Sequence, residues 1–156
     1  MNETIQELNQ IVQDYSEKFS RIPASEFSAK PIPHKWSKKE VLGHLIDSAQ
    51  NNLRRFICGQ YESQPPKILY EQDIWVIANA YQSASKEEVI LLWKLMNERI
   101  CAVLSSMSPV NYTKECDTGR QKPELHTIQW LAADYVKHLK HHVNQIVPEA
   151  FDVVYG

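Results

Sequence analysis

The chain contains few glycines and cysteines. Only 4 of its 156 residues are glycine and 3 are cysteine, namely Cys58, Cys101 and Cys116. An odd number of cysteines without a CxxC pair argues against a disulfide scaffold and fits reduced thiols in a cytoplasm. We expect Cys116, in the polar segment KECDTGRQ, to be the only exposed cysteine.

Long apolar runs and clusters of basic residues are also missing. No stretch approaches the roughly 18 apolar residues that a membrane span needs, and MNETIQELNQ lacks the basic and apolar regions of a signal peptide. Lys and Arg total 17 against 19 Asp and Glu, so the net charge is only −2. We therefore expect a soluble, cytoplasmic protein that binds neither membrane nor nucleic acid.

Helical periodicity dominates what the chain does contain. A length of 156 residues with 43% hydrophobic content suffices for one domain with a substantial core. Near the N-terminus apolar residues recur every three or four positions, at Ile5, Leu8, Val12, Tyr15 and Phe19. This spacing places one apolar stripe of a helix against a core. The prolines of RIPASEFSAKPIPHK then predict an ordered or extended connection.

A second helix begins at WSKKEV. Ser37 and Glu40 have the spacing of a capping box, in which each side chain accepts a hydrogen bond from the backbone of the other residue. We expect this helix to run to about Cys58, with Gly59 as a left-handed stop. DIWVIANAY predicts a short helix, and SKEE at residues 85–88 opens a long one that Pro109 closes.

The remaining segments complete a helical bundle. We interpret the polar segment NYTKECDTGRQKPE as a loop, and the last helix begins near Thr127 and ends before Pro148. Four long helices and one short helix predict an all-α four-helix bundle with one additional short helix. We expect one domain over residues 1–156.

The segment HLKHH places two histidines four residues apart on the last helix. On a helical wheel His142 lies about 40° from the centre of the apolar arc, and His138 lies at the flank of this arc. Both rings should point inward, whereas His141, about 140° from the centre, should face the rim or solvent. Six histidines in 156 residues predict roughly 0.2 such pairs by chance, so the pair by itself is weak support for a metal site.

A third histidine strengthens the hypothesis. His44 lies on a polar stripe at the border of the second helix, together with Ser48, Asn51 and Arg55. Three imidazoles with an open position are typical of a catalytic zinc site, although imidazole also suits nickel, iron and copper. The alternatives are histidines that are satisfied polar groups at a core edge, and a stripe that forms a hydrogen-bond network between helices.

The ring of each metal ligand normally donates its second N–H to an acceptor. Asp134 lies one helical turn before His138 and could accept this hydrogen bond. The alternative for Asp134 is a solvated position.

The segments WSKKEVLGHLIDSAQNNLRRF and DYVKHLKHHVNQI resemble the DinB/YfiT-like superfamily, and the resemblance spans almost the whole chain. It implies a four-helix bundle that holds a divalent metal, often nickel or zinc, through three histidines. Here the matching positions are His44, His138 and His142, and His141 matches a frequent neighbour that is not a ligand. The chain departs from the pattern at Asn144, where members commonly have glycine.

The resemblance also implies candidate activities. Characterised relatives include transferases that conjugate a low-molecular-weight thiol such as bacillithiol to electrophiles, and a mycothiol-dependent isomerase. The metal would lower the pKa of a bound thiol, and Arg55 or Asn51 would orient a carboxylate of the small-molecule substrate or of the thiol. A related hydrolase would use water in place of the thiol.

An alternative of another class is a non-catalytic bundle in stress response, which is stabilised by metal or binds a ligand. Relatives often form homodimers through helix faces. The segment VILLW at residues 89–93 is more apolar than one buried stripe requires, which favours a homodimer here as well.

Overall fold

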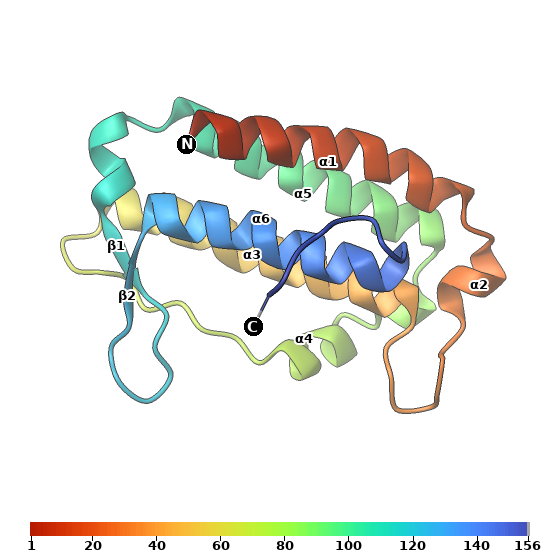
Figure 1. Ribbon diagram of the computed structural model, residues 1–156. Helices are drawn as coiled ribbons and strands as arrows, with labels where there is room; N and C mark the ends of the chain where they lie inside the picture. Colours follow the sequence, from red (N-terminus) through yellow and green to blue (C-terminus); the bar gives the residue numbers. More distant parts are fainter. Residues whose placement is uncertain (156) are drawn as a thin grey trace.

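Four long helices form the body of the molecule. The computed structural model describes residues 1–155, and its long helices are α1 (Asn2–Arg21), α3 (Lys38–Tyr61), α5 (Lys86–Ser106) and α6 (Ile128–Ile146). Helix α1 contacts α5 and α6, and α3 contacts the same two helices, so the four make a closed bundle (Figure 1). The predicted four-helix bundle is confirmed.

Shorter elements connect the long helices. They are α2 (Ala24–Ser28), α4 (Gln72–Ala78), the 3₁₀ helices η1 (Tyr81–Ser83) and η2 (Pro109–Thr113), and the strands β1 (Glu115–Asp117) and β2 (Leu125–Thr127). The connection from α3 to α5 crosses the length of the bundle through α4, so α3 and α5 run in the same direction (Figure 1). Helices α1 and α6 run in the opposite direction.

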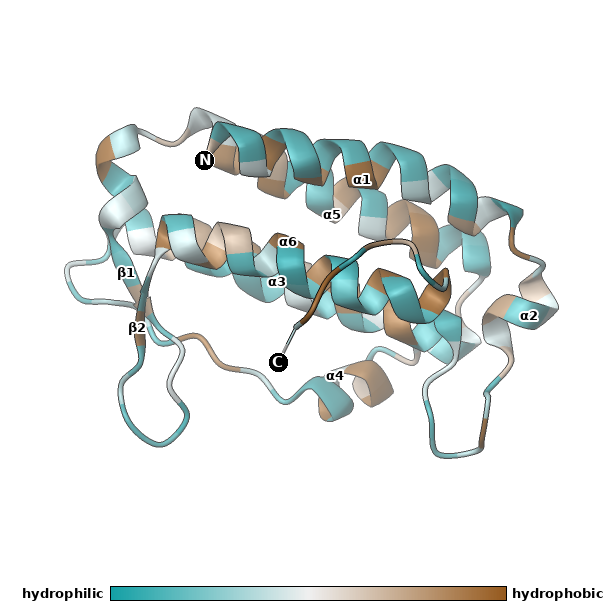
Figure 2. Ribbon diagram, in the orientation of Figure 1, coloured by the Kyte–Doolittle hydropathy of each residue, from teal (hydrophilic) through white to brown (hydrophobic). Residues whose placement is uncertain are grey.

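The core lies between the inward stripes of the four long helices. On α1 the buried residues are Leu8, Ile11, Val12, Tyr15 and Phe19. This agrees with the predicted stripe except that Ile5 is only partly buried and Ile11 is buried as well. Hydrophilic and hydrophobic residues alternate along the ribbons of the long helices (Figure 2), as expected for helices with one apolar stripe. Within residues 1–155 no helix combines the length and the apolar character that crossing a membrane requires.

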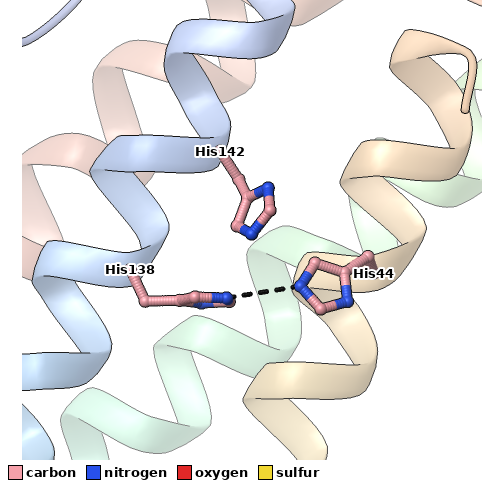
Figure 3. Close-up of side chains that lie close together, drawn as sticks. All are labelled: His44, His138 and His142. Carbon is pink, nitrogen blue, oxygen red and sulfur yellow. Dashed lines mark hydrogen bonds between the residues drawn. The ribbon is translucent and has the colours of Figure 1, made fainter. Parts of the chain in front are cut away.

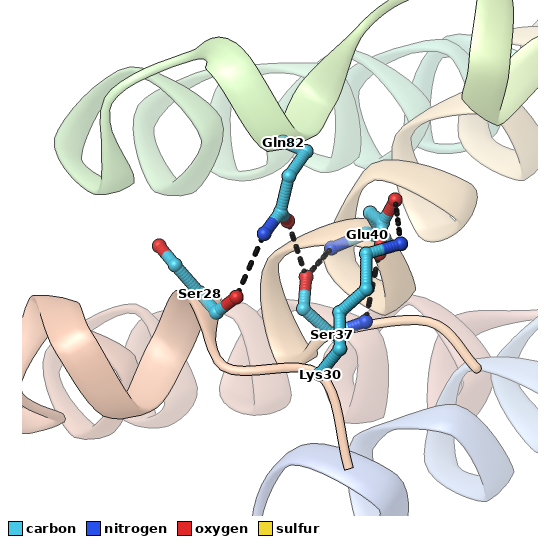
Figure 4. Close-up of polar contacts among 5 residues, drawn as sticks. All are labelled: Ser28, Lys30, Ser37, Glu40 and Gln82. Atoms are coloured by element: carbon cyan, nitrogen blue, oxygen red, sulfur yellow. Dashed lines mark hydrogen bonds and ion pairs between the residues drawn. The ribbon is translucent and has the colours of Figure 1, made fainter. Parts of the chain in front are cut away.

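A hydrogen-bond network fixes the start of α3. The predicted capping box is present, since Ser37 Oγ accepts from the Glu40 backbone at 3.1 Å and Glu40 Oε2 accepts from the Ser37 backbone at 2.8 Å. Ser37 Oγ also donates to Gln82 Oε1 at 2.7 Å, and Gln82 donates to the Ser28 carbonyl (Figure 4). Burial raises the pKa of Glu40, but hydrogen bonds from Lys30 and Ser37 outweigh it and lower the pKa overall. The network orients the helix that carries His44.

The predicted stop of α3 at Gly59 is wrong. The helix continues through Gly59 to Tyr61, and a Cβ at Gly59 would lie 3.0 Å from Ile128 Cδ1 and 3.1 Å from Cys116 Sγ. Gly59 therefore serves close packing inside the helix and not a left-handed turn. The sequence pattern that marks a helix end does not show that Ile128 and Cys116 pack against this glycine.

The predicted loop at residues 111–124 contains strand β1, which forms a small antiparallel hairpin with β2 directly after the loop. Strands β1 and β2 pair with Cys116 opposite His126, and the Asp117 backbone donates to the Pro66 carbonyl at 3.0 Å. Asp117 Oδ1 accepts from the Gly119 and Glu124 backbones and so closes the turn. The prediction that Cys116 is exposed is wrong, because its side chain is 0% exposed and packs beneath α3. Strands of three residues are too short to show an alternating pattern.

Candidate metal centre

Three histidines from two helices meet inside the bundle. His44 lies on α3, two turns after the capped start, and His138 and His142 lie one turn apart on α6. One nitrogen from each ring lies within 4.8 Å of the other two, and the rings face one another (Figure 3). The ring centroids are 5.2 Å apart for His44 and His138, and 4.6 and 4.5 Å for the two pairs with His142.

The spacing of the nitrogens fits a divalent ion. His44 Nε2 and His138 Nε2 are 3.3 Å apart. Two nitrogens that each lie about 2.05 Å from a tetrahedral zinc ion are separated by about 3.3 Å. The same separation also allows a hydrogen bond between two neutral rings (Figure 3). The donor set suits zinc and nickel equally, since imidazole binds both.

The rings are held in the neutral form that metal ligation requires. Burial, and then the proximity of His142, lower the pKa of His44 from an ordinary value near 6.5 to about 3. Burial, followed by the other rings, lowers the pKa of His138 to about 2, and burial also lowers the pKa of His142. Neutral imidazole has a lone pair for a cation, so protons do not compete for these three rings at neutral pH.

Two of the three rings have a buried nitrogen without a hydrogen-bond partner in residues 1–155. These atoms are His44 Nδ1 and His142 Nδ1. The ring of Trp36 lies 5.1 Å from the His44 ring, centroid to centroid, and covers it. The third ring differs, because Ser48 Oγ lies 3.5 Å from His138 Nδ1. Asp134, the acceptor that we predicted for His138, instead accepts from the Tyr155 hydroxyl at 3.2 Å.

Two cavities approach the histidines from opposite ends. The larger, of about 730 Å³, reaches His142 and includes Trp36 and Val41, which precede His44 on the chain. The smaller, of about 270 Å³, reaches His138 and includes Ser48 and Arg55, which follow His44. The histidine cluster therefore separates a wide cavity from a narrow polar one.

The predicted substrate-lining residues divide between two surfaces. Arg55 lines the smaller cavity beside His138, as a residue of the polar stripe should. Asn51 lines a different pocket with Leu53 and Trp75, and its side chain donates to the Asp47 carbonyl at 2.9 Å. Asn52 occupies the cavity side instead. Successive residues of a helix point about 100° apart, so the two neighbouring asparagines face different surfaces.

Sequence reasoning missed three aromatic residues near the cluster. Tyr70 and Tyr155 line the smaller cavity, and Trp36 lines the larger one. Tyr70 precedes α4 and Tyr155 follows α6, so no helical periodicity marks either tyrosine. The Tyr155 ring packs 5.3 Å from the His138 ring, centroid to centroid.

The other histidines stay outside the cluster. His141 is half-buried beside His142, and its Nε2 lies 3.4 Å from Gln145 Nε2, consistent with the predicted orientation toward the rim. His126 stacks on Trp130 and lies 3.3 Å from Glu124 Oε1. His34 is exposed at the edge of the larger cavity.

The fold and the histidine cluster define an all-α bundle with a candidate metal centre between two of its long helices. This chain belongs to the DinB superfamily, whose family model matches residues 7–146. A comparison with curated proteins found no match.

Two solved structures resemble the bundle. YfiT from Bacillus subtilis, described as a probable metal-dependent hydrolase with an unusual four-helix bundle topology, matches with a TM-score of 0.82 and 21% identity. The match covers 93% of this chain and 82% of YfiT. The mycothiol-dependent maleylpyruvate isomerase matches with a TM-score of 0.70 and 14% identity, over 91% of this chain and 59% of the isomerase. Both likenesses concern the fold.

Proposed function

We propose that this protein is a cytoplasmic metal-dependent enzyme that acts on small molecules. His44, His138 and His142 hold one divalent ion, zinc or nickel. The enzyme transfers a low-molecular-weight thiol of the bacillithiol type to an electrophile, or carries out a related hydrolysis. The observation that carries this proposal is the meeting of three neutral imidazoles at ligand spacing between two cavities.

The chemistry follows from an ion with three protein ligands. Such an ion has a position left for a reactant, and it lowers the pKa of a thiol or water that binds there. The chain supplies the surroundings of that position. Trp36 covers the His44 ring, Ser48 lies beside His138 Nδ1, and Arg55 projects toward the smaller cavity.

Two cavities give space on both sides of the histidine cluster. A thiol transfer can place the thiol in one and the electrophile in the other, and a hydrolysis can place the two parts of its substrate there. The larger and smaller cavities therefore support a reaction at the histidines of either kind. The descriptions of YfiT as a probable metal-dependent hydrolase and of the isomerase as mycothiol-dependent agree with both chemistries.

Turnover by metal-loaded protein tests the proposal. Tag-free protein is loaded with zinc or nickel and incubated with several bacterial thiols and electrophiles, with thiol loss and ester or amide hydrolysis as readouts. We expect turnover that His142→Ala abolishes and that the adjacent His141→Ala retains. Metal binding with a large gain in thermal stability, but no turnover across the panel, would support a non-catalytic, metal-stabilised bundle instead.

We also propose that two copies associate through α5. Leu91, Leu92 and Leu95 are 56%, 42% and 48% exposed and share one face of this helix. Their proximity on the surface favours burial against a second copy.

A further inference from the structure

Arg55 is a cation without an anionic partner in the part of the chain that the structure describes. Its side chain is only partly exposed, and none of the ion pairs within residues 1–155 includes it. A partly buried charge is costly unless a charge or several hydrogen bonds compensate it. Arg55 therefore differs from an ordinary surface arginine.

Three hydrogen bonds hold the guanidinium in place. Nε and Nη2 donate to the Ile68 carbonyl at 3.2 and 2.6 Å, and Nη1 donates to Asn52 Oδ1 at 3.2 Å. A guanidinium has five N–H donors. These contacts use three, so two donors on the terminal nitrogens remain for a ligand. The group is preorganised, because its orientation is set before any ligand arrives.

The cavity beside Arg55 has the size and polarity for a compact anion. Its volume of about 270 Å³ equals roughly nine water molecules at 30 Å³ each, enough for a small organic acid. Ser48, Asn52, Tyr70 and Tyr155 contribute polar groups to its lining, and His138 forms the end nearest to the candidate metal.

Asp134 on the same lining acts electrostatically on Arg55 but does not contact its guanidinium as an ion pair. Asp134 accepts a hydrogen bond from Tyr155 at 3.2 Å and forms no ion pair with Arg55 within the described residues. Glu124 Oε1 lies 3.3 Å from His126 Nε2, and the Glu124 side chain is 65% exposed, so solvent screens its charge. Burial raises the pKa of Asp134.

We propose that the smaller cavity is a carboxylate subsite in which Arg55 pairs with the acid group of a reactant whose reacting end lies at the histidine cluster. This inference rests on the proposed function only for the identity of the reaction. The carboxylate can belong to the thiol or to the electrophile, because both meet the same guanidinium. Planar carboxylate matches the fork of an arginine, with which it forms paired, charge-assisted hydrogen bonds.

Binding of succinate tests the subsite without requiring turnover. We expect succinate to bind metal-free protein in calorimetry and to shift the NMR signals of the Arg55 Nη–H groups, whereas neutral succinamide does neither. Arg55→Gln should weaken succinate binding by about 10- to 100-fold, since it removes a charge-assisted hydrogen-bond pair. Asp134→Asn should preserve or strengthen binding. The matched control is Arg54→Gln, which removes the same charge from an exposed neighbour.

Further measurements separate a binding role from a structural one. Arg55→Lys keeps the charge but loses the fork, so intermediate binding is expected even if Arg55→Gln unfolds. A thiol acid, 3-mercaptopropionate, distinguishes the source of the carboxylate. Its binding to zinc-loaded protein is measured in Arg55→Gln and in His142→Ala. If both substitutions weaken binding, the carboxylate belongs to the thiol. If only Arg55→Gln weakens binding, the carboxylate belongs to the electrophile.

The inference fails if succinate leaves the Arg55 Nη–H signals unchanged, or if Arg54→Gln weakens binding as much as Arg55→Gln. Either result leaves the metal proposal intact, because no metal is present in that measurement. Conversely, Arg55-dependent succinate binding by a protein that never takes up metal would retain the subsite and reject the proposed enzyme.

Discussion

The three clustered histidines are neutral because they are buried together. His44 is fully buried, and the rings of His138 and His142 pack against it, so water cannot solvate a protonated ring. Desolvation penalises the imidazolium, and each neighbouring ring adds to this penalty. The same features that lower the pKa leave nitrogen lone pairs free for a cation.

Acid should destabilise the metal-free protein through His44. In the folded state its pKa is about 3, whereas the unfolded chain takes up the proton near pH 6.5. The unfolded state therefore binds more protons between these values, and stability falls as the pH falls below 6.5. At pH 5 this group accounts for about 2 kcal/mol. Urea unfolding with a chelator, at pH 7.5 and 5.0, measures the loss.

In His44→Gln, which has no titrating ring at this position, the loss of unfolding free energy between pH 7.5 and 5.0 should be smaller by about 2 kcal/mol. The exposed His34→Gln serves as the control and should follow the unmodified protein. An equal acid-induced loss in His44→Gln and in the unmodified protein would show that His44 does not resist protonation.

The orientation of a side chain was predictable from the sequence where helical spacing alone determines it. The inward orientation of His138 and His142 and the outward turn of His141 follow from angles on one helix. Asn51 and Asn52 differ by one position, and their opposite surroundings depend on how α3 rotates against its neighbours. Whether the three histidines bind metal stays a prediction.

At the scale of elements, the start of α3 depends on Ser37. Its hydroxyl caps the helix and also contacts Gln82, whereas Ser85 caps α5 only through the Glu88 backbone at 3.1 Å. Ser37→Ala should cost about 1–2 kcal/mol of unfolding free energy, more than Ser85→Ala. Urea denaturation of both variants gives the comparison. Equal losses would mean that the contact with Gln82 contributes nothing.

Gly43 allows η1 to pack on α3. A Cβ at this position would lie 2.1 Å from Tyr81 Cδ2, inside the ring, whereas a Cβ at Gly59 meets its nearest neighbour at 3.0 Å. Gly43→Ala must displace Tyr81, whose hydroxyl donates to Asp47 Oδ1 at 2.6 Å. We expect a loss of about 1–3 kcal/mol in thermal or urea unfolding, and a smaller one for Gly59→Ala. A neutral Gly43→Ala would contradict this packing.

The long helices and the short helix α4 were predictable as elements, whereas α2 and the hairpin were not. Capping residues and apolar stripes mark α1, α3, α5 and α6 in the sequence, and these helices contain most of the core. The hairpin of β1 and β2 depends instead on distant contacts, such as the hydrogen bond from Asp117 to the Pro66 carbonyl. Such pairing leaves no local pattern.

At the scale of the whole molecule, the exposed face of α5 predicts a dimer. Leu95→Glu would place a charge on the face formed with Leu91 and Leu92, and we expect it to yield monomers in sedimentation analysis. Val110 is 73% exposed on η2, so Val110→Glu is a matched control that should leave the oligomeric state unchanged. A monomeric unmodified protein at high concentration would refute the prediction.

The central claim is that histidines of α3 and α6 bind one metal ion together. The metal content of the purified protein tests this claim most directly. Tag-free protein and His44→Ala, each equilibrated with zinc or nickel and then desalted, are compared by elemental analysis. The account predicts one ion per chain in the unmodified protein and loss of that ion in His44→Ala. Unmodified protein that retains no ion, or a His44→Ala variant that retains a full equivalent, would contradict it.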